Sequence, residues 1–358
     1  MTVIIGVDPH KQSHTAVAIC GEEREVSKVT VRATCQQTAS LLAWAEPFGE
    51  RTWAIESAGG LGYLLAQQLV DAGEHVVDVP PTLASRVRVL GTGRSDKNDP
   101  NDALSVAIAA LRSQGLRRVE VAEHSEIMRL LAKRNHDLGR MRARLICRLH
   151  HALAELSPGG IAKELYASDA DRLLESFEPA TPIEHMRYEL ALELLDDVRR
   201  LDGQIKESHR RIRTAVRASK TSLTELFGVG PVVACAVIGY TGNVRRFANR
   251  DHFAAYAGVA PIEHSSGGRI AHRLSRRGHR KLNNAIHIAA ISQIRQPHSD
   301  GRAYFDRRVA EGKTKREAVR SLKRQISNAL YRQLVIDAER VREDTRKRLV
   351  ASVVGSAS

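Results

Sequence analysis

The sequence predicts an α/β domain at the N-terminus, a helical middle region and a mainly α-helical C-terminal domain. The N-terminal apolar runs are short and alternate with helical stretches, which is typical of α/β domains. The middle carries apolar residues at heptad-like spacing, and the last third has apolar helices separated by glycine-rich turns. We place the boundaries at 1–112, 113–220 and 221–340, followed by a basic helical end and a frayed tail at 341–358.

The N-terminal domain is expected to contain a mixed sheet. Three closely spaced apolar runs predict a β-meander, and alternating helices and strands follow them. The predicted strands are Val3–Val7, Thr15–Cys20, Val26–Val31, Thr52–Ile55 and His75–Val79, and the predicted helices are Gln36–Trp44 and Leu61–Ala72. This order of elements is that of ribonuclease-H-like or RuvC-like domains.

The charge balance points to a polyanionic partner. The 358 residues include 55 Lys and Arg against 41 Asp and Glu, a net charge of +14, which favours nucleic acid over the alternative of a basic but ordinary enzyme. The 4 cysteines are scattered without a Cys-x-x-Cys pair, which argues against a zinc site or a disulfide framework. No apolar run approaches the ~18–20 residues of a membrane span, and the first strand leaves no room for a signal peptide, so we expect a cytoplasmic protein.

Four acidic residues have the placement expected of a metal site. Asp8 ends the first predicted strand and Glu56 ends the fourth, whereas Asp99 and Asp102 share one face at the start of a helix. Clustered carboxylates repel one another unless cations lie between them, and oxygen ligands suit Mg²⁺ or Mn²⁺. We therefore predict one catalytic metal pocket, in which two ions about 3.5–4 Å apart would stabilise the attacking and leaving oxygens of a phosphate.

Two features of this region can also be explained without a functional role. Asp99-Pro100-Asn101-Asp102 also fits a helix cap with proline at the first helical position, and the matching order of Asp8 and Glu56 is what favours a metal site. His10 and Lys11 directly follow the first acid. They are expected either to contact phosphate or metal-bound water, or to be ordinary surface residues.

Basic side chains next to the predicted pocket are expected to bind nucleic acid. The segment 85–97 contains two glycines, which indicate a flexible loop that would steer a polyanion to the acids, with a solvated loop as the alternative. Its cations are Arg86, Arg88, Arg94 and Lys97. A tight turn is expected at 57–60, where small residues would let a nucleic-acid backbone approach.

The middle region predicts a pair of long helices. One covers His124–Leu156, and the second begins at the capping box Thr181–Glu184, with proline at its first helical position. The apolar seam of the second helix is Leu194, Val198, Leu201, Ile205 and Ile212. We predict an antiparallel coiled-coil arm that dimerises or bridges domains. Its outward arginines would grip nucleic acid or form a solvated face: Arg140, Arg142, Arg144 and Arg148.

The C-terminal domain carries two glycine-rich segments. Gly228 and Gly230 precede an apolar helix at 232–240 and resemble a helix-hairpin-helix, in which backbone N–H groups bind a phosphate; a simple packing unit is the alternative. Ser265-Ser266-Gly267-Gly268, taken alone, is most often a linker. Here, however, surrounding cations would hold phosphate and stabilise transition-state charge: Arg269, Arg273, Arg276, Arg277, Arg280 and Lys281.

Taken together, these motifs resemble one known family. GVDPHK, KNDPNDA, GVGP, YAGVAP, SSGG and LSRRGHRKL occur in one order, and GKTKREAV follows them. Over nearly its whole length the chain is similar to the DEDD-type insertion-sequence transposases related to the Piv and MooV invertases. It departs from them at LSRRGH, where the family more often has Lys and Asn.

The resemblance implies a RuvC-like domain joined by a coiled coil to a transposase domain with a catalytic serine. By position that serine is Ser266, with Ser265 as its neighbour, and the acids Asp8, Glu56, Asp99 and Asp102 would hold Mg²⁺. It further implies a tetrameric prokaryotic enzyme, located at the nucleoid when bound to DNA. A structured non-coding bridge RNA would specify target and donor DNA.

The expected function is therefore DNA recombination through a phosphoserine link between protein and DNA. The rival enzymatic interpretation is a junction-resolving nuclease, in which the acids activate water and the serine is idle. A catalytically silent nucleic-acid-binding protein is the alternative from a different class, and the intact acids argue against it. A covalent protein–DNA adduct distinguishes the two enzymes.

Overall fold

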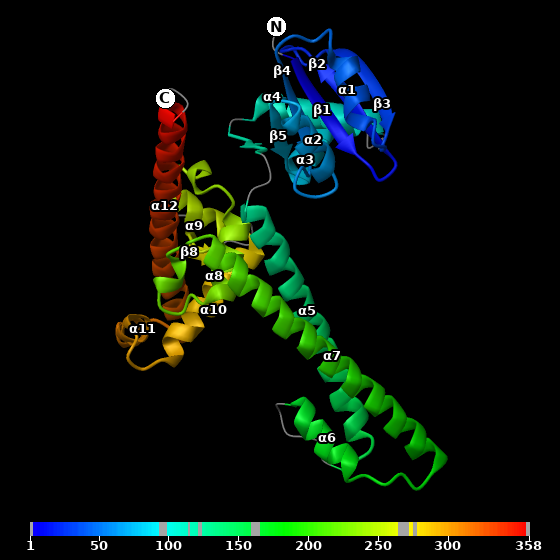
Figure 1. The fold of residues 1–358 in the computed structure, drawn as a ribbon, viewed down its shortest axis with the longest axis vertical. Helices are drawn as coiled ribbons and strands as arrows, with labels where there is room; N and C mark the ends of the chain where they lie inside the picture. The colour runs from blue at the N-terminus through cyan, green and yellow to red at the C-terminus, as the bar shows by residue number, and fades with distance from the viewer. Residues whose placement is uncertain are drawn as a thin grey trace, which may run out of the picture. The chain divides into compact units, whose positions relative to one another are not determined.

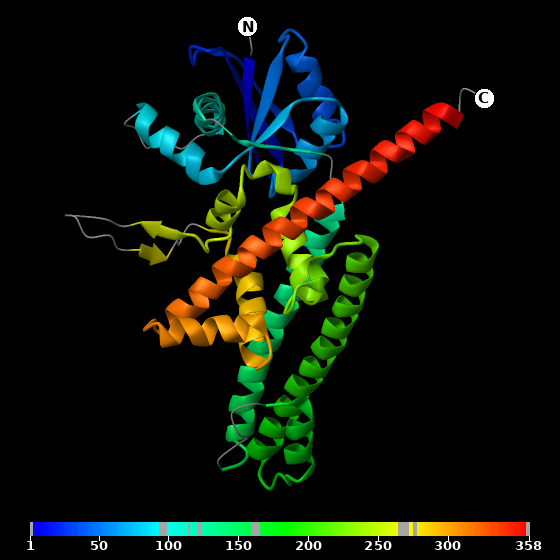
Figure 2. The same ribbon diagram turned by 90° about the vertical axis from the view of Figure 1, so that its left-hand side faces the viewer.

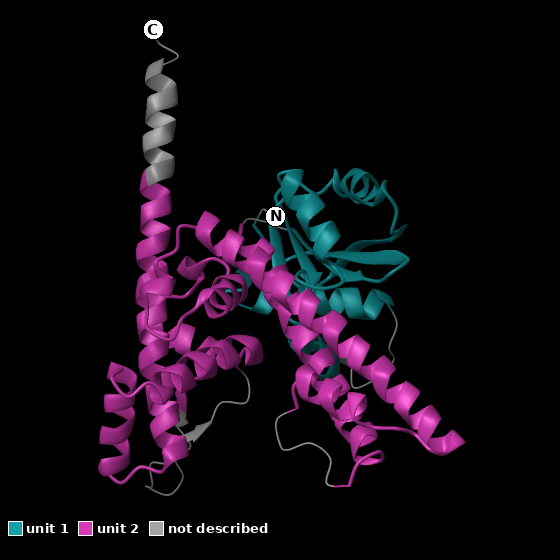
Figure 3. Cartoon of the chain, turned by 60° about the horizontal axis from the view of Figure 1, so that its bottom comes forward, with its two compact units in different colours: residues 1–122 teal, residues 123–358 magenta. Residues whose placement is uncertain are grey.

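The structure is a computed structural model that describes residues 3–92, 99–113, 115–120, 124–158, 165–263, 272–274 and 278–355. It divides into two compact units, residues 1–122 and 123–358, which Figure 3 shows in different colours. The finer division into the segments drawn from the sequence stays a prediction. Among the described residues, no helix is both long enough and apolar enough to cross a membrane.

The first unit is built on a six-stranded mixed sheet with the order β3-β2-β1-β4-β5-β6 (Figure 1). β1 pairs antiparallel with β2 and parallel with β4, so the central strand joins a β-meander to a parallel half. The strands are β1 (Val3–Pro9), β2 (Ser13–Ile19), β3 (Glu25–Arg32), β4 (Arg51–Glu56), β5 (Val76–Val79) and β6 (Arg117–Arg118). The predicted mixed sheet and its meander are confirmed.

Helices cover both faces of this sheet, because side chains alternate between the faces along each strand. On one face Ile5, Val7 and Trp53 pack against α1 (Gln37–Ala45) and α2 (Tyr63–Asp71). On the other face Ala54, Val17 and their neighbours pack against α3 (Pro81–Thr92) and α4 (Asp99–Arg112). The predicted helices at 36–44 and 61–72 correspond to α1 and α2 and are confirmed to within a few residues.

The prediction of a flexible loop over 85–97 is wrong for residues 85–92. Residues up to Thr92 belong to α3, because Leu83, Ala84 and Val87 lie at helical spacing and pack against α4. Tertiary packing thus overrides the local glycine content. The rest of the segment, with Arg94 and Lys97, lies outside the described residues.

The second unit contains a pair of long helices, α5 (His124–Ala154) and α7 (Pro182–Ala218). They lie side by side and run in opposite directions (Figure 1 and Figure 2), and α6 (Ala167–Glu175) packs against their far end. The predicted capping box is confirmed, since Thr181 Oγ1 accepts a hydrogen bond of 3.2 Å from the Glu184 N–H and the Glu184 carboxylate accepts one of 3.0 Å from the Thr181 N–H.

The seam predicted on α7 is used for packing inside this chain. Val198 and Ile212 are fully buried, Leu201 is 4% exposed, and Val198 belongs to the same apolar cluster as Leu149 and Leu153 of α5. Arg142, expected to point outward, instead pairs with Asp202 of α7. The helix pair is therefore observed, whereas heptad packing along its length, or between chains, is not established.

The rest of the second unit is a helical domain around one apolar core, in which α8 (Pro231–Thr241) packs among α5, α7 and α10. The further elements are η1 (Leu223–Glu225), η2 (Val244–Arg246), α9 (Arg250–Tyr256), β7 (Pro261–Glu263), β8 (His272–Leu274), α10 (Arg280–Arg295), α11 (Asp300–Ala310) and α12 (Lys315–Gly355). The mainly helical C-terminal domain is confirmed, with a short β7–β8 hairpin added to it.

Candidate metal centre and nucleic-acid contacts

Two of the four predicted acids lie at one edge of the sheet. β1 and β4 are neighbouring parallel strands with Val7 opposite Ile55, so the residues that follow, Asp8 and Glu56, come side by side. Asp8 is only 6% exposed, although it is a carboxylate. A carboxylate so far removed from water needs compensating partners, which makes this strand end a candidate functional site.

Helix α4 brings the other two acids to the same edge. It packs directly on β1, and a Cβ atom at Gly6 would lie 2.2 Å from the Ala103 carbonyl oxygen and 2.4 Å from the Ala107 nitrogen. Only glycine permits this approach, because both of the nearest atoms belong to the backbone. The first turn of α4 is thereby placed at this edge, with Asp99 in one group with Asp8 and with Asp102 close enough to Glu56 to repel it.

His10 links two of the acids. Its Nδ1 atom lies 3.5 Å from Oδ2 of Asp8, and its Nε2 atom lies 3.9 Å from Oδ1 of Asp99. Asp8, His10 and Asp99 each offer a ligand atom, and these three atoms lie within 4.8 Å of one another. This is a group of ligands of the kind that can hold a divalent cation.

Glu56 and Asp102 complete the acidic cluster electrostatically. The pKa of Glu56 is raised, first by burial and then by repulsion from the carboxylates of Asp8 and Asp102. Arg88 and His10 offset part of this effect. The raised pKa means that the neighbouring carboxylates disfavour ionised Glu56, and a cation among them would reverse this effect.

A guanidinium already occupies part of the cluster. Arg88 of α3 forms an ion pair with Oδ1 of Asp102, and only 30% of its side chain is exposed. Arg88 thus offsets the negative charge of Asp102, and its contact with nucleic acid stays a prediction. Lys11 and Arg86 are exposed, as a contact with a polyanion requires.

The turn after β4 fixes the position of Glu56. Ser57 has a φ of 51°, in the left-handed region that is costly for a residue with a Cβ. It is held there by hydrogen bonds from the Ser57 N–H to the Val79 oxygen (3.1 Å) and from the Gly60 N–H to the Ser57 oxygen (2.7 Å). The Asp78 carboxylate accepts a further bond of 2.8 Å from the Ala58 N–H. The tight turn expected at 57–60 is confirmed.

The donor set fits a hard divalent ion. All four acids present oxygen, and among the described residues His10 adds a ring nitrogen to the group, whereas the four cysteines lie elsewhere in the sequence. Such a set suits Mg²⁺ or Mn²⁺ better than a thiophilic metal. The residues that would hold the ion are Asp8, Glu56, Asp99 and Asp102.

We expect Gly6→Ala to loosen the site without touching an acid. The new methyl group would overlap the backbone of α4, so the free energy of unfolding should fall by about 1–3 kcal/mol and α4 should move away from β1. Mn²⁺ binding, measured by titration calorimetry, should weaken as Asp99 and Asp102 move away. Gly49→Ala is the matched control, because a Cβ at Gly49 meets nothing within 4 Å. Equal Mn²⁺ affinity in the two variants would contradict the assigned role of Gly6.

The predicted nucleophile is not among the described residues of the second unit. Ser265, Ser266, Arg269, Arg276 and Arg277 all lie outside them, and the backbone of Arg273 is described as part of β8. Strand β7 leads into this segment and β8 leaves it, and the two pair with Pro261 opposite Leu274.

Two of the sequence motifs are held together by a glycine–glycine crossing. A Cβ at Gly278 would lie 2.2 Å from the Gly258 Cα atom, and Gly258 has a φ of +67°. The Asn283 amide donates to the carbonyl oxygens of Ala257 (2.9 Å) and Gly258 (3.0 Å), and the His279 N–H donates to the Tyr256 oxygen. The start of α10 is thus fixed on the loop after α9. It presents Arg280 to solvent, whereas the Lys281 amine lies 5.7 Å from the centre of the Tyr240 ring.

The two glycines before α8 have different environments. Gly228 has a φ of +81°, and a Cβ there would lie 2.8 Å from the Ala289 oxygen of α10, so packing accounts for this glycine. Gly230 is the exposed N-cap residue of α8, and a Cβ there would meet nothing within 4 Å. Of the two, Gly230 alone has backbone open to a phosphate.

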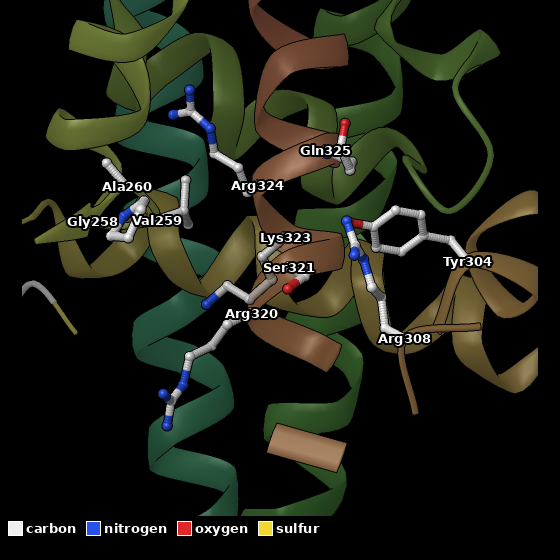
Figure 4. A pocket seen from close by; sticks show the side chains of 11 residues that line it. Gly258, Val259, Ala260, Tyr304, Arg308, Arg320, Ser321, Lys323, Arg324 and Gln325 are labelled. Carbon is white, nitrogen blue, oxygen red and sulfur yellow. The ribbon is translucent and has the colours of Figure 1, made fainter. Parts of the chain in front are cut away.

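Sequence reasoning missed a basic pocket in the second unit. Arg308 of α11 and Arg320, Lys323 and Arg324 of α12 line it (Figure 4). The signal was present in the sequence, because the α12 cations follow one another at helical spacing.

Two family models match the chain. The model of the DEDD transposase of the IS110 type, described as a transposase, matches residues 5–158. The model described as the transposase IS116/IS110/IS902 family matches residues 220–306. The first match contains all four acids of the candidate metal centre, and the second contains the segment with Ser266.

Related proteins extend this similarity along the chain. A 44.8 kDa protein of insertion element IS116 from Streptomyces clavuligerus is 24% identical, covering 92% of this chain and 94% of its own. A protein of insertion element IS900 from Mycobacterium paratuberculosis is 25% identical over the same shares. A probable family 20 transposase from Pseudomonas aeruginosa is 29% identical over 81% of this chain and 80% of its own.

Among solved structures, RuvC of Thermus thermophilus in complex with a Holliday junction substrate matches 33% of this chain and 100% of its own. The TM-score is 0.27 at 16% sequence identity.

Proposed function

We propose that this chain, which matches transposase family models over residues 5–158 and 220–306, cuts and rejoins DNA at the ends of an insertion sequence. One observation carries the proposal for the chemistry. Asp8 and Glu56 from parallel strands and Asp99 and Asp102 from one helix turn converge at a single sheet edge. Four carboxylates from three elements are otherwise an unfavourable arrangement, so their convergence favours a metal-dependent phosphoryl-transfer site.

A bound Mg²⁺ would supply Lewis-acid stabilisation of the charge that develops on the phosphate. The residues of the chain position the acids and contact the DNA. Asp8, buried at the strand end, anchors the site, and the Ser57 turn orients Glu56 beside it. The His10 ring lies between two of the acids, 3.5 Å from the Asp8 carboxylate and 3.9 Å from that of Asp99. Lys11 and Arg86, both exposed, would contact the approaching phosphate backbone.

The nucleophile of this proposal is the hydroxyl of Ser266. Its attack on a DNA phosphate forms an ester between the serine and the phosphate and breaks one phosphodiester bond, and the released DNA oxygen takes up a proton. The alternative, a junction-resolving nuclease, uses water in place of the serine and needs only the acids described here. The two differ in whether DNA becomes attached to the protein, which decides between them.

We further propose that a structured RNA guides the reaction and that the enzyme acts as a tetramer. The net charge of +14 favours a polyanionic partner, and the resemblance to the DEDD-type transposases implies that a guide RNA is one. The buried positions on α7 are not available for assembly, so a multimer has to use other surfaces.

We expect the protein to copurify with a discrete RNA when it is expressed together with the DNA that flanks its gene. Sequencing of the bound RNA should return one structured transcript of that flanking DNA. Ribonuclease treatment should abolish recombination of a plasmid carrying donor and target sites, and adding the transcript back should restore it. Recombination by RNA-free protein would rule out the guide.

A further inference from the structure

The second unit holds a pocket of about 290 Å³ that the metal chemistry does not use. Its walls are the loop 258–261 after α9, one face of α11 and the first turns of α12 (Figure 4). Among its described lining residues there is no carboxylate, whereas Arg308, Arg320, Lys323 and Arg324 all contribute to it. A cavity with this lining favours an anion.

Two of these cations have no carboxylate partner within the described part of the chain. Arg308 pairs with Glu311, and Arg324 pairs with Asp251. Arg320 and Lys323, by contrast, form no ion pair with any residue that the structure describes. The Nη1 atom of Arg324 is also buried without a hydrogen-bond acceptor among the described atoms. Among the described residues, the pocket lining thus carries four cations without a carboxylate, and Arg324 has an unused donor.

The charge is fixed in place by the packing around it. The Lys323 amine donates a hydrogen bond of 2.6 Å to the Asn283 oxygen, and the Asn283 amide holds the loop at Gly258. Arg308 donates to the Tyr304 hydroxyl at 3.1 Å. Burial, together with repulsion from Arg320, lowers the pKa of Lys323 to about 8, so an anion in the pocket would relieve a charge that is costly in its absence.

The surroundings favour a strand over a small anion. Lys313, just before α12, and Arg316, in its first turn, are both exposed. Arg316, Arg320 and Lys323 lie at helical spacing, so the basic surface continues beyond the pocket. Pro261, which lines the pocket, is the first residue of β7 and opens the hairpin whose strands flank the Ser266 segment. A polyanion bound along this surface would enter the domain at that hairpin.

We propose that this pocket holds a backbone phosphate of DNA, and that the stripe Arg316–Arg320–Lys323 carries the adjoining phosphates of the same strand. The identification of the polyanion as DNA rests on the proposed function. The pocket positions a strand without reading its sequence, because contacts to phosphate carry no base information.

The test measures binding of a short labelled DNA duplex and a matched RNA by fluorescence anisotropy between about 50 and 200 mM salt. Arg320→Gln and Lys323→Met are expected to weaken DNA binding about 5- to 10-fold each and to lower the salt slope by about one unit. The matched control is Arg332→Gln, an exposed arginine on the same helix outside the pocket, which should change the affinity far less. Circular dichroism melts establish that each variant folds, and exposed Arg320 is the safer of the two positions.

Each other outcome overturns the proposal. An equal loss in Arg332→Gln would mean that only overall charge matters. Weakened binding of RNA with unchanged binding of DNA would assign the pocket to RNA. Inorganic phosphate could bind the wild type and not Arg320→Gln while both proteins bind DNA equally. The pocket would then be a site for a small anion. Asp8→Asn in the same assay separates the proposed metal chemistry from the proposed phosphate pocket. This variant should lose recombination activity and bind DNA as tightly as the wild type.

Discussion

Replacement of Asp8 by asparagine is expected to abolish DNA cleavage and strand exchange while leaving the fold intact. Asparagine has the same shape but no negative charge, so the site loses its most buried anionic ligand. The rate of recombination should fall on the order of 10³-fold or more, because stabilisation of charge at the phosphate supplies much of the rate enhancement in such reactions. Asp102→Asn should behave similarly and also releases Arg88 from its ion pair.

The measurement combines an activity with a binding readout. Plasmid recombination reports the chemistry, and calorimetric titration with Mn²⁺ should show weaker binding in Asp8→Asn. The melting temperature should not fall, since the substitution removes one of several mutually repelling carboxylates. Asp71→Asn, an exposed aspartate at the end of α2, is the matched control and should be silent in all three assays. Normal activity of Asp8→Asn, or of wild type in excess chelator, would contradict the metal centre.

The acidic site could be predicted because it depends on strand ends. Asp8 and Glu56 each follow an apolar run, and neighbouring parallel strands place their last residues at one edge. The contact that recruits α4 could not be predicted, because the packing of Gly6 against Ala103 is a long-range event with no local pattern. The positive φ of Ser57 has no local signal either, because its cause is hydrogen bonding to β5.

The wrong prediction of a loop over residues 85–92 has a physical cause. Glycines near Arg88 suggested a loop, but packing of Leu83 and Val87 on α4 keeps this segment helical. The apolar spacing on α7 predicts a coiled-coil arm that dimerises or bridges domains, and association between chains stays a prediction. The same spacing is satisfied by α5 and α6 inside one chain, where Val198 is fully buried. Periodicity establishes that a face is covered, and not which partner covers it.

Replacement of Ser266 by alanine is expected to eliminate the covalent protein–DNA adduct and strand exchange together, while DNA binding persists. A serine nucleophile conserves the phosphodiester energy in its ester with phosphate, so the broken strand can be rejoined to a new partner without an external energy source. Water as nucleophile releases a free end, and that strand cannot be rejoined by simple reversal. Exchange therefore requires the adduct, and loss of the hydroxyl removes both.

Ser265→Ala is the matched control, because it deletes the same hydroxyl one residue earlier and should only reduce the rate. Labelled DNA incubated with each protein is separated on a denaturing gel, where an adduct migrates with the protein and a cut strand migrates as free DNA. An adduct that disappears in Ser265→Ala and persists in Ser266→Ala would move the nucleophile by one residue. Cleavage by the wild type with no adduct at any time would replace the recombinase with the nuclease, since the acids alone would then account for all of the chemistry.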